Sequence, residues 1–356
     1  MIRILVIGPS IERTKGGMAT VIRDALALNQ QRPEVELTHL VSHVEGSVAE
    51  RIMVTAKSLW YTLRHRNKFD LAHIHVASKG SFYRKSLFVH LCRLLGKPVV
   101  LHVHGADFDS FYFAAASMLR RYIRHTFRVA AQVFVLSVFW RNFFQQHITK
   151  GNVQIVHNGV DVAAFSTCIS AVPDYNNFLF LGRLGKRKGV YDLLQAIEMI
   201  VAAMPTSPMH FWLAGDGEIN AVIEEVRRRN LGAFVTVVGW IDGQQKLQYL
   251  KQADTMLLPS YDEGLPMSIL EAMACGKVII STFVGGIPDL IINGEHGFLI
   301  QPGDVNALAK AIRNVHEQKE RMRVISAKNI DRIREHYDLN KINLQILETY
   351  QRMTRK

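Results

Sequence analysis

Two glutamates, Glu263 and Glu271, stand eight residues apart in the segment PSYDEGLPMSILEAMACG. Pro266 suits the first position of a helix and Gly276 its end, so we expect Glu263 in the loop before a helix and Glu271 inside that helix. A helix N-terminus at the carboxyl edge of a parallel sheet offers free amides and partial positive charge to a diphosphate. A carboxylate beside it can hold sugar hydroxyls. The segment therefore predicts a diphosphate site with a sugar next to it.

A second constellation lies upstream, in the segment GRLGKRKG. It places Arg183 and Lys188 directly after an expected strand. Arginine offers a flat fork of donors and lysine a point charge, so the pair can neutralise a diphosphate leaving group without a metal ion. The alternative is a basic turn in solvent, to which we assign Lys186 and Arg187.

The elements that must position these residues are short β-branched runs that alternate with segments of helical period. This alternation predicts parallel sheets with crossover helices in two doubly wound α/β domains. The expected strands are 3–8, 34–41, 71–76, 99–104, 132–136, 153–157, 178–182, 209–214, 235–238, 255–258, 278–281 and 297–300.

Domain limits follow from a loss of periodicity over residues 161–174. We expect an N-terminal domain over 1–165, a C-terminal domain over 166–338, and a last helical segment over 339–356 that packs back on the first domain. The length of 356 residues fits two such domains.

Composition narrows the class of protein. Hydrophobic residues make up 48% and charged residues 21%, the profile of a globular chain. The three cysteines are far apart and outside any CxxC spacing, so we expect neither a disulfide framework nor a zinc site, and a reducing cytosol fits. The N-terminal apolar run 4–7 is too short for a signal sequence core, and the longest later run, 130–140, is too short to span a bilayer, so we expect a cytoplasmic chain.

Charge is distributed unevenly. Residues 1–165 hold 21 Lys and Arg against 10 Asp and Glu, whereas residues 166–356 hold 22 against 21. The net charge of +12 therefore lies almost wholly in the first half. Such asymmetry predicts an anionic partner for that half, either a nucleic acid or a phospholipid surface.

The motifs together resemble the family 4 glycosyltransferases of the GT-B fold, whose hallmark is a glutamate, seven residues and a second glutamate. The resemblance covers nearly the whole chain. It rests on GPSIERTKGGMA, HVHGAD, IVHNGVD, LGRLGKRKG, LAGDGE, LLPSYDEGLPMSILEAMACGKVIIST, VGGIPDLI and NGEHGFLI in this order. It implies two Rossmann-like domains that face each other across a cleft.

The resemblance also implies roles for individual residues. Glu263 would contact hydroxyls of the transferred sugar, with Gly264 and Leu265 in the same donor site, and Glu271 would contact the nucleotide ribose. Arg183 and Lys188 would lie on the diphosphate. Two further elements complete the set: the loop with Gly16 and Gly17 for the phosphates and acceptor, and His104 for the catalytic centre.

Other histidines and acids have simpler interpretations. His73 and His75 share the strand pattern of His102 and His104 without the motif, and we expect them to be structural. Asp107 and Asp109 imitate the DxD motif with which GT-A glycosyltransferases hold a metal, but two acids at this spacing are common by chance. Family members of this type retain the anomeric configuration, and we expect no metal and no other cofactor.

Three basic, aromatic-rich segments account for the charge: 51–68, 82–97 and 117–128. On a helical wheel, the last of them separates apolar residues from Arg120, Arg121, Arg124 and Arg128. Such helices are typical of proteins that bind an anionic membrane surface, although a single charged face is more often only solvated. We find no nucleic-acid-binding motif, so a membrane is favoured over nucleic acid.

The resemblance, together with the basic first half, implies a retaining glycosyltransferase that moves a hexose or N-acetylhexosamine from a nucleotide-diphosphate sugar, UDP being the commonest nucleotide in the family. The expected acceptor is a polyprenyl-diphosphate-linked saccharide of surface polysaccharide (O-antigen) synthesis, at the inner face of the plasma membrane. A soluble acceptor, a nucleotide-sugar epimerase, a phosphorylase and a basic nucleic-acid-binding protein remain as alternatives.

Overall fold

The computed structural model describes residues 1–30, 32–169 and 173–354. The chain divides into two compact units, which are described separately: Met1–Gly159 with Asn340–Lys356, and Val160–Leu339. Parts of two predicted segments, residues 170–172 of the boundary region and 355–356 of the last segment, lie outside the described residues.

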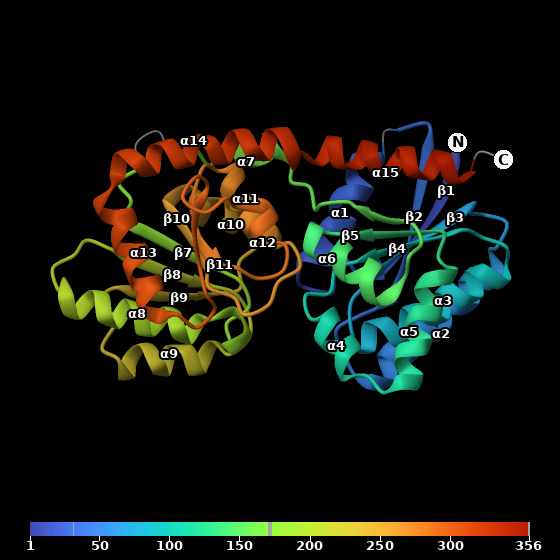
Figure 1. Ribbon diagram of the computed structural model, residues 1–356, viewed down its shortest axis with the longest axis horizontal. Helices are drawn as coiled ribbons and strands as arrows, with labels where there is room; N and C mark the ends of the chain where they lie inside the picture. The colour runs from blue at the N-terminus through green and yellow to red at the C-terminus, as the bar shows by residue number, and fades with distance from the viewer. Residues whose placement is uncertain (31, 170–172, 355–356) are drawn as a thin grey trace. The chain divides into compact units, whose positions relative to one another are not determined.

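The first unit contains a six-stranded parallel sheet in the order β2-β1-β3-β4-β5-β6. Its strands are β1 (Ile2–Pro9), β2 (Val35–His43), β3 (Leu71–Val76), β4 (Val99–Val103), β5 (Gln132–Val135) and β6 (Val153–Ile155). Its helices are α1 (Gly17–Asn29), α2 (Val48–Arg64), α3 (Gly80–Leu94), α4 (Phe108–Ala114), α5 (Ser117–Val129), α6 (Val138–Phe143) and α15 (Leu339–Thr354), with a π-helical turn over Phe144–Ile148 (Figure 1).

Both faces of this sheet are covered, which explains why its strands are apolar without alternation. Leu5 and Ile7 belong to the core cluster that includes residues of α3, α4, α5 and α6. Ile4 and Val6 point to the opposite face, into the cluster with residues of α1 and α15. The C-terminal helix is thus part of the first unit's core.

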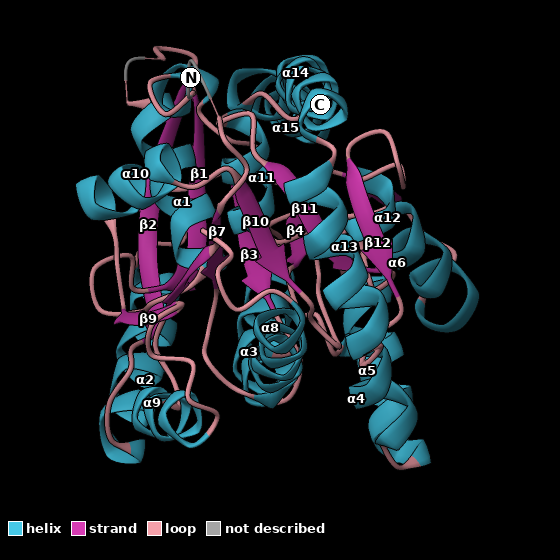
Figure 2. Cartoon of the chain, turned by 90° about the vertical axis from the view of Figure 1, so that its left-hand side faces the viewer, coloured by secondary structure: helices cyan, strands magenta, loops and turns pink. Residues whose placement is uncertain are grey.

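The second unit has its own six-stranded parallel sheet, in the order β12-β11-β10-β7-β8-β9. Its strands are β7 (Asn177–Leu181), β8 (His210–Ala214), β9 (Val235–Gly239), β10 (Thr255–Leu258), β11 (Val278–Thr282) and β12 (Gly297–Ile300). Its helices are α7 (Val162–Ser166), α8 (Val190–Ala203), α9 (Ile219–Arg228), α10 (Gly243–Gln252), α11 (Met267–Ala274), α12 (Ile287–Leu290), α13 (Val305–Glu317) and α14 (Lys319–His336), with a 3-10 turn over Lys186–Lys188. Figure 2 shows this unit's strands among its helices.

The predicted fold class is confirmed, because two parallel sheets with alternating helices are present. Every predicted strand is found, and β3, β10 and β12 have the predicted bounds. The other strand ends shift by one or two residues. Helix α11 begins at Met267, so Pro266 is its N-cap residue rather than its first helical residue.

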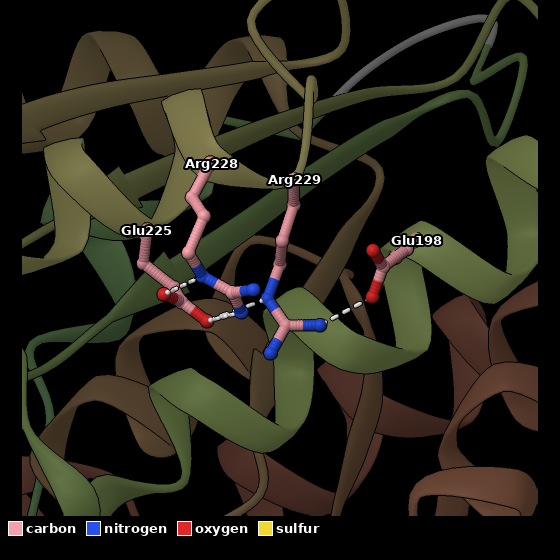
Figure 3. A network of polar contacts seen from close by, with 4 residues as sticks. All are labelled: Glu198, Glu225, Arg228 and Arg229. Atoms are coloured by element: carbon pink, nitrogen blue, oxygen red, sulfur yellow. Dashed lines mark hydrogen bonds and ion pairs between the residues drawn. The ribbon is translucent and has the colours of Figure 1, made fainter.

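A network of ion pairs joins α8 to the end of α9 in the second unit (Figure 3). Glu225 accepts hydrogen bonds from Arg228 (Nε, 2.8 Å) and from Arg229 (Nε, 2.7 Å), and Arg229 also pairs with Glu198 of α8. The hydrogen bond from Arg228 is the main reason why the pKa of Glu225 is lowered to about 2. This network stabilises the frame of the unit and involves none of the predicted site residues.

Candidate active site

The second sheet has the strand order of a dinucleotide-binding fold, in which the order of the parallel strands reverses between β7 and β10. Ligands bind at such a switch point, beyond the carboxyl ends of the strands. The loop after β7 carries Arg183 and Lys188, and the loop after β10 carries Glu263. Both predicted donor segments therefore flank the position where the topology places a ligand.

Two glycines let these loops approach one another. Gly189 has φ +71°, and a Cβ there would lie 2.0 Å from the carbonyl oxygen of Pro259. Gly285 has φ +53°, and a Cβ there would lie 1.7 Å from the carbonyl oxygen of Glu263. Larger residues at either position would clash with backbone, so the glycines set the close packing of the loops around Glu263.

Glu263 is buried at this junction, with 5% of its surface exposed. It forms an ion pair with Lys188 and accepts a 2.7 Å hydrogen bond from Ser260 Oγ. The pair joins the two segments that sequence assigned to the donor site. Gly264 and Leu265, which follow Glu263, are buried as well, and the Gly264 carbonyl accepts a 2.7 Å hydrogen bond from the Gly286 amide.

Glu271 lies inside α11, is 4% exposed, and accepts a 2.6 Å hydrogen bond from Lys246 Nζ of α10. Burial raises the pKa of Glu271, and Lys246 opposes that shift. Each hallmark glutamate is therefore paired with its own lysine: Glu263 with Lys188 of the 3-10 turn, and Glu271 with Lys246 of α10. Each presents a carboxylate with a cation beside it, an arrangement that can bind hydroxyl groups and phosphate oxygens together.

The two arginines of the glycine turn have different environments. Arg183 is exposed next to Gly217, where its Cγ would lie 3.0 Å from an added Cβ. Arg187 donates from Nη1 to the Asp262 carbonyl at 3.0 Å, and its own carbonyl accepts from the Tyr261 amide at 2.9 Å. Arg187 is exposed, as expected for a turn residue, and it also hydrogen-bonds the loop that contains Glu263.

In the first unit, the predicted residues lie at the carboxyl ends of β1 and β4. Gly16, with φ +119°, is the N-cap of α1, and Gly17 is its first residue. Both glycines are exposed, as a loop that meets a ligand requires. His104 directly follows β4 and is partly buried, and burial lowers its pKa to about 3.

His104 belongs to a cluster of four histidine rings on the sheet face that α1 and α15 cover. Its ring stacks on that of His75 and is tilted against that of His102. His75 Nδ1 lies 2.8 Å from His104 Nε2, and His73 Nε2 lies 3.3 Å from His102 Nδ1. His73 also hydrogen-bonds the hydroxyl of Tyr350 in α15. Burial lowers the pKa of all four imidazoles, so they are neutral at physiological pH and each can both donate and accept.

Three of these histidines, His73, His75 and His102, have ring nitrogens within 4.8 Å of one another. The rings of His73 and His75 are nearly parallel, however, at 4.4 Å between centroids and 16° between planes. Parallel rings direct their in-plane lone pairs side by side rather than to a common point. The cluster therefore suits a hydrogen-bonded network better than a tetrahedral metal site.

The aspartates that imitate a DxD motif do not share a site. Asp107 is engaged by Lys79 Nζ at 2.7 Å and by the hydroxyl of Ser78. Asp109 accepts a 2.7 Å hydrogen bond from the amide of Ser110. Asp107 thus closes the loop between β3 and α3 onto the start of α4.

Helix α5 forms over the predicted segment and buries its apolar side, including Ile123 and Phe127. Two of its arginines turn toward the protein: Arg120 Nε donates to the Ala115 carbonyl at 2.9 Å, and Arg124 Nη1 to the Tyr112 hydroxyl at 3.2 Å. Arg121 and Arg128 remain exposed. Large apolar side chains are exposed on the same unit's helices, among them Ile52, Trp60, Leu94, Phe113 and Met118. Across the described ranges, no helix is long and apolar enough to cross a bilayer.

Two family models of glycosyltransferases match the chain. A family model described as Glycosyltransferase Family 4 matches residues 18–164, and one described as Glycosyl transferases group 1 matches residues 175–318. The chain is 26% identical over 278 residues to the UDP-Gal:alpha-D-GlcNAc-diphosphoundecaprenol alpha-1,3-galactosyltransferase of Escherichia coli, which covers 73% of this chain and 69% of that protein.

Solved structures have the same fold. Sucrose-phosphate synthase from Thermosynechococcus elongatus aligns with a TM-score of 0.79 at 21% identity, over 99% of both chains. Anabaena HepE in complex with UDP and glucose aligns with a TM-score of 0.77 at 19% identity, over 99% of this chain and 100% of that one. The chain therefore contains the two glycosyltransferase domains that these family models describe, has the GT-B fold, and is a glycosyltransferase.

Several contacts of the site were not predicted. Lys246 and Ser260 hold the two glutamates, and His75 contacts His104 although it was expected to be only structural. The last contact had a signal in the sequence. The four histidines alternate along two neighbouring strands and so share one sheet face. His75 pairs with His102 in the register of β3 and β4, and His104 follows two residues later on the same face.

Proposed function

We propose that the protein transfers a hexose or N-acetylhexosamine from a UDP-sugar to a polyprenyl-diphosphate-linked saccharide, with retention of anomeric configuration and without a metal ion. The assignment of the donor site rests on the buried Lys188–Glu263 ion pair at the switch point of the second sheet. A cation for the leaving diphosphate and a carboxylate for sugar hydroxyls are already adjacent there. The complexes of HepE with UDP and with UDP-glucose support the choice of nucleotide.

In this proposal, Lys188 and Arg183 stabilise the negative charge that develops on the departing diphosphate. The bond between the sugar C1 and the phosphate oxygen breaks, and a bond from C1 to the acceptor oxygen forms on the same face. The proton of the acceptor hydroxyl passes to the leaving diphosphate. Glu263 orients the sugar, Glu271 holds the ribose, and His104, as a neutral imidazole, contacts the reacting groups as donor or acceptor of a hydrogen bond.

The acceptor half rests on two observations. The similar Escherichia coli enzyme is named for a diphosphoundecaprenol acceptor. The first unit combines excess positive charge with exposed aromatic and aliphatic side chains on α2, α3 and α5, which is the pattern of a surface that meets anionic lipid. We infer that the protein works on the inner face of the plasma membrane as a peripheral enzyme.

The donor assignment is tested by calorimetric titration with UDP and by transfer from a panel of UDP-sugars to a synthetic polyprenyl-diphosphate N-acetylglucosamine. We expect Glu263→Gln to reduce turnover strongly while UDP still binds. Transfer should persist in EDTA. An absolute requirement for Mg²⁺ or Mn²⁺ would contradict the metal-free mechanism, and donor turnover without acceptor would favour an epimerase.

The membrane assignment is tested by sedimentation with vesicles of phosphatidylglycerol and with neutral vesicles. Each basic residue near an anionic surface contributes about 1 kcal/mol, which weakens as salt is added. Replacing Arg121 and Arg128 by Gln should therefore reduce binding to anionic vesicles, and replacing Lys310 and Arg313 on α13 should not. Equal binding to both kinds of vesicle, or none to either, would contradict a charged membrane surface and favour a soluble acceptor.

A further inference from the structure

Helix α3 contains a buried lysine that forms no ion pair with a carboxylate among the residues that the structure describes. Lys85 is 2% exposed, and its Nζ donates to the hydroxyl of Ser42 at the end of β2. Ser42 Oγ in turn donates to the Gly8 carbonyl at 2.8 Å, so Lys85 reaches the carboxyl ends of β1 and β2. This is the edge of the first sheet next to its own switch point, between β1 and β3.

Arg84 and His43 interact electrostatically with this lysine, as do His39 and His75. Arg51 interacts with Arg84 and His43. Arg84 is half-buried, and its Nε has no hydrogen-bond partner in the part of the chain that the structure describes. His43 Nδ1 is buried and equally without a partner among the described residues. Arg51, on the first turn of α2, binds the Gly46 carbonyl through Nε and Nη2 at 2.9 and 2.8 Å.

Each of these groups makes it less favourable for its neighbours to carry a positive charge. Burial is the first cause of the lowered pKa of His43, at about 4, and Arg84, Lys85 and Arg51 lower it further. Burial likewise lowers the pKa of Lys85, and Arg84 adds to the effect. The nearby carboxylates are engaged by other groups: Glu50, on the first turn of α2, pairs with Arg13 at 2.7 Å, and Glu45 accepts a hydrogen bond from the Lys15 amide at 3.2 Å.

Cations that cluster without a carboxylate are unfavourable unless an anion joins them. We propose that Arg84 and Lys85, with His43 and Arg51, bind a phosphate or diphosphate group, and that this group is the diphosphate of the lipid-linked acceptor. The second part rests on the proposed function. Arg84 supplies a fork for two oxygens, and Lys85 a buried point charge that a bound anion keeps protonated.

Inorganic diphosphate is the probe, titrated into the full chain by calorimetry in the presence of saturating UDP, which occupies the donor site. We expect Arg84→Gln to weaken diphosphate binding at least tenfold and to leave the affinity for UDP unchanged. Arg93→Gln, an exposed arginine on the same helix, is the matched control and should have no effect. Lys85→Met gives a second test with a side chain of similar length, provided that its circular dichroism matches that of the wild type.

Three outcomes separate the sources of the anion. A tenfold or greater rise in KM for the polyprenyl-diphosphate acceptor in Arg84→Gln, with the KM for the UDP-sugar unchanged, supports the acceptor site. Loss of diphosphate binding in a protein that never glycosylates a lipid diphosphate supports the anion site and contradicts the proposed function. Unchanged diphosphate binding, or a defect confined to phosphatidylglycerol vesicles, overturns the proposed site and leaves the transferase activity standing.

Discussion

Replacement of Lys188 by alanine tests the donor site most directly. Its side chain is 14% exposed and that of Glu263 is 6% exposed, so water screens their ion pair only weakly. Loss of a charge-assisted contact to the leaving diphosphate should cost about 2 to 4 kcal/mol of transition-state stabilisation, or roughly thirty- to a thousandfold in kcat/KM. The same change leaves the Glu263 carboxylate buried with only Ser260 as a donor, which should lower the free energy of unfolding by about 3 kcal/mol.

The two effects can be separated by adding Glu263→Gln to Lys188→Ala. The double variant no longer buries an unpaired charge, so we expect it to recover most of the lost stability in urea unfolding but none of the lost turnover. Rates are measured with a UDP-sugar under single-turnover conditions, and Lys186→Ala on the same turn serves as control. If Lys188→Ala folds normally and keeps wild-type turnover, the diphosphate must bind elsewhere.

Three further changes test other parts of the molecule. Glu271→Gln leaves Lys246 unpaired and removes a ribose contact, so UDP should bind about tenfold more weakly by calorimetry; unchanged affinity would refute the ribose assignment. Because burial lowers the pKa of His73 and His104 to about 3, the unfolded chain takes up protons below pH 6.5 that the folded chain does not. As the pH is lowered from 6.5 to 3, the free energy of unfolding should therefore decrease by up to about 1.4 kcal/mol per pH unit for each histidine. The decrease should be less steep in His73→Gln. Glu225 has a pKa of about 2, so its stabilisation is complete above pH 4.5 and disappears toward pH 2; Glu225→Gln should cost about 1 kcal/mol at pH 7, less at pH 3, and leave UDP affinity intact.

The strands could be predicted because their information is local. Runs such as Leu71–Val76 and Thr255–Leu258 are buried on both faces, so their apolar character does not depend on which neighbour covers them. Their ends depend on hydrogen bonds to a partner strand. For this reason β2 continues to His43, whose carbonyl accepts from the Ser10 amide at 2.9 Å, although the apolar run ends earlier.

The site could be predicted only in part, because its residue types are local but their partners are not. Glu263 and Lys188 follow strands and could be expected at one sheet edge, and their ion pair agrees with that expectation. Lys246 belongs to a polar helix whose side facing Glu271 is set by packing of α10 and α11. Lys85 was predicted wrongly for the same reason. It lies in the segment 82–97, which we expected to form a charged membrane face, but its side chain is buried in the structure.

The charged side chains at the carboxyl edges of the two sheets are paired differently. At the second sheet, the two hallmark glutamates are each paired with a lysine, Glu263 with Lys188 and Glu271 with Lys246, while Arg183 is exposed. Sugar and ribose hydroxyls need acceptors as well as donors, so a carboxylate beside a cation suits a nucleotide sugar. Around Lys85 and Arg84 the first sheet offers cations without paired acids, which suits a ligand group that has only acceptor oxygens. This difference in pairing agrees with our proposal that the second unit binds the nucleotide sugar and the first unit a phosphate-bearing acceptor.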